Sequence, residues 1–129
     1  MTNSIFIGKA LYLLLNDDAI LKKSVTGVYP LIAENDAKYP FITYSRDNIY
    51  SNICKDGYYE DKVTFSVTVV SANYLNSLDI ANRVRAILEQ KEIITKDVIL
   101  YNVKLTGIDE SFNDNAYIQN LSFDCTVTN

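Results

Sequence analysis

Adjacent acidic side chains are the residues of this chain whose types and spacing come closest to a catalytic set. They form three pairs: Asp17 and Asp18, Glu60 and Asp61, and Asp109 and Glu110. Two carboxylates can act as acid and base in glycoside hydrolysis, and Asp109, Glu110 and Asp114 offer oxygen ligands of the kind that hard cations prefer. Each pair falls in a stretch that favours turns, where neighbouring acids are usually solvated charges. The spacing around Asp114 matches no known calcium loop, so we expect no catalytic residues and no metal ligands.

Other residue types that usually carry chemistry are scarce. The chain has no histidine, the commonest general base and metal ligand. Its two cysteines, Cys54 and Cys125, form no CxxC pair, so we expect no zinc site and interpret them as reduced thiols, with a disulfide as the alternative. The GxGxxG, P-loop and GxSxG signatures are also absent, so we expect no cofactor. The sequence therefore predicts a protein that is not an enzyme, with a small carboxylate enzyme as an alternative.

Length and composition favour a single globular domain over residues 1–129. The net charge of −4 argues against direct nucleic-acid recognition, which needs clustered cations. No stretch is long and apolar enough to span a membrane, and the apolar run at residues 10–15 lacks the basic start of a secretion signal. Ten tyrosines and no tryptophan suit surfaces that are partly wet and partly buried, such as subunit interfaces.

One strand and one helix, within residues 62–89, organise the rest of the chain. Residues 63–69 alternate apolar and polar side chains, the period of a half-buried strand. Residues 75–88 then predict a helix with one apolar stripe, made of Leu78, Ala81, Val84, Ile87 and Leu88. On its polar face, Asp79 and Arg83 are spaced for an exposed ion pair. Each element has one apolar side, so the simplest burial is helix on sheet.

The remaining elements complete this layer. We expect helices over residues 5–15, capped by Ser4, and over 19–24. Strands are expected over residues 28–32, 41–45, 99–105 and 117–128, with Pro30 limiting the first to an edge. The final strand points Leu121, Phe123, Cys125 and Val127 inward, after a turn at 113–115. The predicted fold is an α+β two-layer sandwich, with an antiparallel sheet of about four strands and two main helices on one face.

A long segment at residues 46–61 has the composition of a turn yet carries large apolar side chains. We predict a projecting loop or hairpin arm that contacts another chain. The alternative is an ordinary hairpin packed on its own domain. The candidate subunit or partner interface consists of Ile49, Tyr50, Ile53, Tyr58 and Tyr59.

Four segments, taken in order, resemble a known family. They are IGKALYLLLNDDAILKKSVTGVYPL, YPFITYSRD, VTFSVTVVSANYLNSLDIANRVRAILE and a closing hairpin. Their order resembles the tail-completion and tail-terminator proteins of long-tailed bacteriophages and prophages. The segments at 39–44 and 81–88 match the most recognisable places. The likeness covers nearly the whole chain, although the segment at 46–61 is more apolar than the family pattern.

The resemblance implies a structural role without catalysis. Such proteins form rings, commonly six-fold, at the head-proximal end of the tail, where they stop tube growth and help to join the head. The implied partners are further copies of the chain, the tail-tube protein and a head-completion or connector protein. The implied location is the virion tail or neck, and the host cytoplasm during assembly. Alternatives are another neck or baseplate component and a small-molecule-binding domain with a pocket under the helix at 75–88.

Overall fold

The computed structural model describes residues 1–53 and 55–128, and strands form most of its regular structure. In these residues the strands form one six-stranded sheet in the order β1-β2-β3-β6-β5-β4. Their bounds are β1 Val28–Pro30, β2 Phe41–Ile53, β3 Tyr59–Ser71, β4 Glu92–Ile94, β5 Ile99–Asn113 and β6 Ala116–Thr128.

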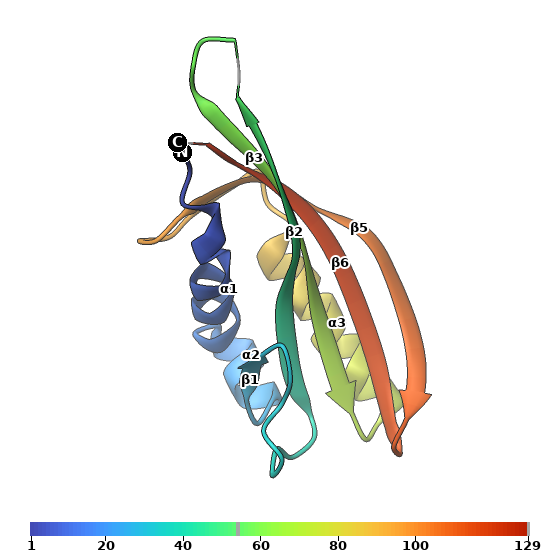
Figure 1. Cartoon of the computed structure of the whole chain (residues 1–129). Helices are drawn as coiled ribbons and strands as arrows, with labels where there is room; N and C mark the ends of the chain where they lie inside the picture. Colours follow the sequence, from blue (N-terminus) through green and yellow to red (C-terminus); the bar gives the residue numbers. More distant parts are fainter. Residues whose placement is uncertain (54, 129) are drawn as a thin grey trace.

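Four long strands make up the centre of the sheet. β2 pairs antiparallel with β3, β3 with β6, and β6 with β5. The short β1 lies parallel to the start of β2, and the short β4 lies antiparallel to the start of β5. A tight turn joins β5 to β6, with Asp114 and Asn115 at φ of 50° and 60°, a conformation that Asn and Asp tolerate better than most residues. The sheet is strongly twisted and curled (Figure 1).

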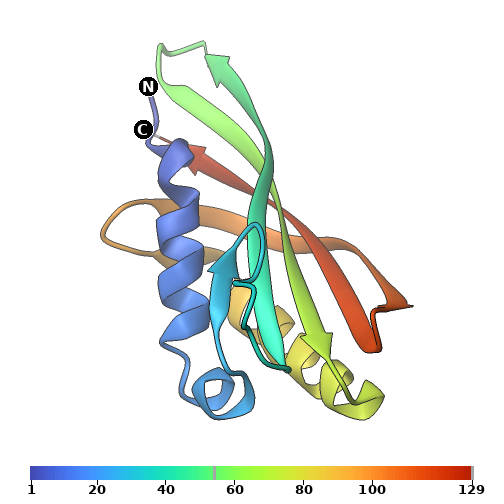
Figure 2. The same cartoon turned by 60° about the horizontal axis from the view of Figure 1, so that its bottom comes forward.

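The helices lie inside the curl of the sheet. They are α1 Ile7–Asn16, α2 Ala19–Ser24 and α3 Tyr74–Leu88, with a short 3₁₀ turn, η1 Ser4–Phe6, before α1. α1 contacts β1 and β2, and α3 contacts β3 and β6. Figure 2 shows α1 running alongside the sheet and α2 turning beneath it. The N-terminus and the end of β6 lie near one another at one end of the sheet (Figures 1 and 2).

The core is built on the alternation of the two central strands. The odd-numbered residues of β3 from Val63 to Val69 are fully buried, while their even-numbered neighbours are half-buried or exposed. The predicted alternation of this strand and the inward residues of the last strand are therefore confirmed. Phe65 and Phe123 stack at the centre, with ring centroids 5.2 Å apart and planes at 13°. Such an offset pair adds to the free energy gained from burial alone.

The predicted four-stranded antiparallel two-layer sandwich is wrong. The sheet has six strands, it is mixed because β1 is parallel to β2, and it curls around three α-helices. β1 was expected as an edge strand, but its parallel pairing with β2 was not. β4 was not predicted, because its three residues are too few to show a period in the sequence. The segment after residue 45 continues β2 to Ile53, because strand pairing uses backbone groups and does not require apolar side chains.

Candidate interaction surface

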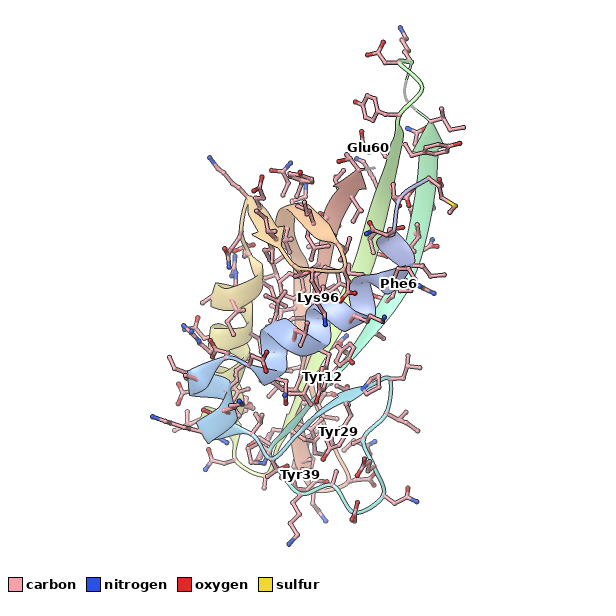
Figure 3. The ribbon with its side chains drawn as sticks, turned by 90° about the vertical axis from the view of Figure 1, so that its left-hand side faces the viewer. Phe6, Tyr12, Tyr29, Tyr39, Glu60 and Lys96 are labelled. Carbon is pink, nitrogen blue, oxygen red and sulfur yellow. The ribbon has the colours of Figure 1, made fainter. Side chains whose placement is uncertain are left out.

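The arm is the far end of the β2–β3 hairpin, residues 49–59. The two strands pair from Asn48 opposite Thr64 to Ile53 opposite Tyr59, so most of the segment expected to be a loop is a regular ladder. Among the described residues, the pairing of β3 with β6 ends where Glu60 lies opposite Thr128. The hairpin tip therefore extends past the other strands, and Glu60 in Figure 3 lies near its base.

Exposure divides the five candidate interface residues into two groups. Tyr50, Ile53 and Tyr58 are 62%, 64% and 43% exposed. Ile49 and Tyr59 are half-buried, and Ile49 packs against the core. Ile49 therefore also stabilises the fold of its own chain, and the most accessible apolar side chains of the arm are Tyr50 and Ile53.

These side chains lie on two faces of the hairpin. Ile49 is opposite the buried Val63, so it points toward the helices, as does Ile53 further along the same strand. Tyr50 is opposite the exposed Lys62 and points to the other face. The arm consequently presents apolar surface on both sides and has no single continuous patch.

The base of the arm is fixed to the N-terminal segment. The hydroxyls of Thr2 and Ser4 donate hydrogen bonds to the Asp61 carboxylate, and Arg46 donates to the Ile5 carbonyl at 3.1 Å. Burial opposes ionisation of Asp61, but the hydroxyl donors outweigh it and hold the pKa of Asp61 below its ordinary value. Ser4 therefore anchors the arm and makes no side-chain cap, and the predicted N-cap at Ser4 is wrong.

A second carboxylate, Asp18, joins two helices. It caps α2 by accepting from the Leu21 amide at 3.0 Å, and it accepts two hydrogen bonds from the Arg83 guanidinium at 2.6 and 3.0 Å. The predicted pairing of Arg83 with Asp79 is therefore wrong. The hydrogen bonds from Arg83 hold the pKa of Asp18 below its ordinary value. This acid has a structural role that accounts for its position.

The two carboxylates of the third acidic pair, Asp109 and Glu110, point to opposite faces of β5. Glu110 accepts from the Tyr74 hydroxyl at 3.0 Å and from the Gln119 amide at 2.9 Å, on the helix side of β5. Asp109, its neighbour, points to the opposite face because successive strand residues alternate. In residues 1–53 and 55–128, no group of three or more potential ligands is placed to hold a metal ion.

Exposed apolar side chains that the sequence prediction missed lie on α3 and, separately, on β5. Leu75 and Leu78 on α3 are 69% and 38% exposed, and Ile108 and Phe112 on β5 are 50% and 58% exposed. The predicted helical stripe included Leu78 and left out Ile80, whereas in the structure Ile80 is buried and Leu78 is not. The sequence did hold a signal, because the apolar positions of this helix are too many for one stripe.

Among the described residues, the surface cavities do not form a ligand pocket under α3. A groove of about 1030 Å³ lies between the N-terminal segment and residues 95–99, away from the core side of α3. That side is filled by Ile80, Val84 and Leu88, which pack into the core. The place under this helix, where the small-molecule-binding alternative would need a pocket, is therefore occupied by the protein's own side chains. Within the described part of the chain, no helix has the length and apolar character needed to cross a membrane.

The structure describes only one of the two cysteines. Cys125 is a free, buried thiol on β6, and burial together with Asp124 raises its pKa to about 12. A thiol in this state is a poor nucleophile. Cys54 lies outside the described residues.

Comparison with known proteins identifies a shared fold. No protein-family model matches the chain, and a search of curated proteins finds no match either. Among solved structures, the chain is similar to one in "Virion of native gene transfer agent (GTA) particle". The TM-score is 0.79 over 92% of each chain, at 16% sequence identity. This similarity establishes that the two chains share a fold along nearly their whole length.

Proposed function

We propose that this chain is a structural protein of a phage-like particle and a single tail-completion or tail-terminator domain over residues 1–129. The observation that supports this most is the fold shared with a chain of a gene transfer agent virion, which covers 92% of both chains. The order of the tail-completion motifs in the sequence supports the same function independently. The chain would form a ring, commonly six-fold, at the head-proximal end of the tail, end tube growth and help to join the head.

The proposed mechanism depends on shape and on contacts between chains. The sheet and its helices form a rigid body held by one continuous core. The arm extends from this body with Tyr50 and Ile53 exposed, so it can contact an adjacent copy or the tail tube. A closed ring uses heterologous interfaces, in which one surface meets a different surface of the next copy. Tail-tube and head-completion proteins are the proposed partners, and no bond is made or broken.

Electron microscopy of particles made without this chain tests the role directly. A tail terminator predicts tails longer than normal and heads that remain separate. Tails of normal length beside unjoined heads would instead indicate a head-joining protein of the neck, and missing baseplates would indicate a baseplate component. Particles of normal length and composition would contradict the proposal altogether.

The arm is tested by replacing Tyr50 and Ile53 together with serine. Both side chains are mostly exposed, so the fold is expected to survive, while tail length or head joining becomes abnormal. The matched control is Ile20→Ser, because Ile20 is 52% exposed on α2, away from the arm. Particles of normal length and joining, made by a folded double variant, would show that the arm has no part in assembly.

A further inference from the structure

Both edges of the sheet leave long stretches of strand without a partner in the described part of the chain. β1 covers β2 only from Ile42 to Tyr44, which leaves residues 45–53 open, here called the β2 edge. β4 and the segment before it reach β5 only as far as Leu105, whose amide bonds to Glu89, which leaves residues 106–113 open, the β5 edge. In the β2 edge the Ile49 amide bonds to the Asn48 side chain at 2.9 Å. Rows of backbone groups without a strand partner are templates for pairing with another chain.

The two edges carry some of the features that normally block such pairing, namely the charged residues Arg46 and Asp47 on one and Asp109 and Glu110 on the other, but they lack others. Neither stretch contains a proline or a lysine, the residues that proteins commonly place on free edges. Each carries two large exposed apolar side chains, Tyr50 and Ile53 on the β2 edge and Ile108 and Phe112 on the β5 edge. Each edge does contain or adjoin a bulge, between Arg46 and Asn48 and between Leu105 and Gly107. Most of each edge lies beyond its bulge and is regular strand.

We infer that the β5 edge of one copy pairs antiparallel with the β2 edge of the next copy, so that the sheet continues from subunit to subunit. This inference rests on the proposed ring and specifies the contact that would build it. Three antiparallel steps lead from β2 to β5, so these strands run in opposite directions within one chain. In a closed sheet, rotation about the ring axis turns each strand into its neighbour without reversing its sense along the axis, so β5 meets the next β2 in an antiparallel sense.

The positions of the open stretches fit a closed assembly. Each open stretch is the C-terminal part of its strand, so the two lie at opposite ends of the sheet. Pairing them staggers neighbouring copies along the strand direction and tilts the strands relative to the ring axis. Closed sheets require such a tilt, typically about 35–45°. A two-fold pairing of one edge with itself would leave the other edge unpaired, whereas the head-to-tail arrangement uses both.

Two variants of the full chain test this pairing. The β2-edge variant carries Tyr50→Lys and Ile53→Lys, and the β5-edge variant carries Ile108→Lys and Ser111→Lys. Each places one lysine on each face of the strand, at an exposed position. The control carries Ile20→Lys and Leu75→Lys on α2 and α3, which matches the added charge away from both edges. Circular dichroism verifies that all three variants fold.

Native mass spectrometry and sedimentation velocity then measure self-association over a range of concentrations. We expect the wild type and the control to form oligomers, and each edge variant to associate at least about tenfold more weakly. A mixture of the two edge variants retains one intact β2 edge and one intact β5 edge, so it is expected to form heterodimers and nothing larger. That result is specific to head-to-tail pairing.

Other outcomes would overturn the inference. If edge variants and control associate equally, the copies meet elsewhere; if the β2-edge variant still dimerises, pairing is between two β5 edges. A wild type that remains monomeric up to its solubility limit would also overturn edge pairing as a property of this chain. The proposed role in tail completion would still be decided separately, by tail lengths in particles made without the chain.

Discussion

At the scale of single residues, one carboxylate of each acidic pair holds segments of the chain together. Asp18 links α2 to α3, Asp61 fixes the N-terminal segment to the base of the arm, and Glu110 bonds Tyr74 and Gln119. Each connects parts of the chain that are distant in the sequence, which explains why neighbouring residues alone could not reveal their roles. These bonds account for the positions of the three carboxylates.

Asp18 offers a prediction about acid stability. Its pKa is lowered in the folded chain, so its stabilising effect is present above the pKa of the unfolded chain and is lost as the pH falls through the lower folded value. Asp18→Asn keeps an acceptor for the α2 cap but loses the charge that pairs with Arg83. We expect the variant to be less stable than wild type at pH 7, with the difference shrinking below about pH 4.

Urea unfolding of wild type and Asp18→Asn at pH 7 and at pH 3 measures this difference in stability. Asp18→Ala is the companion variant, since it also removes the cap and is expected to cost about 1 kcal/mol more than the asparagine variant. A stability difference between wild type and Asp18→Asn that stays constant from pH 7 to pH 3 would exclude the ion pair as its source.

At the scale of elements, side-chain period determined what the sequence could predict. The strand at residues 63–69 and the inward residues of the last strand follow a clear period, and the structure confirms them. The helix at 19–24 was predicted from the residues that can cap it, Asn16, Asp17 and Asp18, and it is also confirmed. β4 is too short to show a period, and a bulge shifts the phase of β5, so that Leu100 and Val103 are both buried although they lie three residues apart. Bulges and edge pairings depend on tertiary contacts, which no local pattern records.

The candidate interface was predictable only in part, for the same reason. Composition alone placed exposed apolar residues in the arm, and Tyr50 and Ile53 are indeed exposed. It could not show that Ile49 packs against the core, nor that Leu75 and Leu78 lie outside the buried face of α3. The open edges of β2 and β5 depend on sheet order, which becomes known only when distant strands are paired.

The stacked aromatic pair of the two central strands gives a prediction at this scale. Phe65 is fully buried against Phe123, so Phe65→Ala is expected to lower the free energy of unfolding by about 3–5 kcal/mol through lost burial and a cavity. The matched control is Phe112→Ala, at a position 58% exposed, with an expected loss below about 1 kcal/mol. Denaturant unfolding of both variants measures the difference, and similar losses at the two positions would show that the core is not centred on this pair.

At the scale of the whole molecule, a rigid curled sheet with open edges and an extended arm suits a protein that acts by assembly. The fold recurs in a chain of a gene transfer agent virion although the sequences are only 16% identical. The tail-terminator role remains our proposal. It requires the chain to bind one end of a tail tube and to stop its growth.

The most direct measurement is the growth of tail tubes in the presence of the purified chain. Tails assembled without it are mixed with the chain and then supplied with fresh tail-tube protein, and their lengths are measured by electron microscopy before and after. We predict that the chain binds at one end and that the treated tails do not lengthen, while untreated tails continue to grow. Treated tails that lengthen as fast as untreated ones would contradict a role in ending the tube.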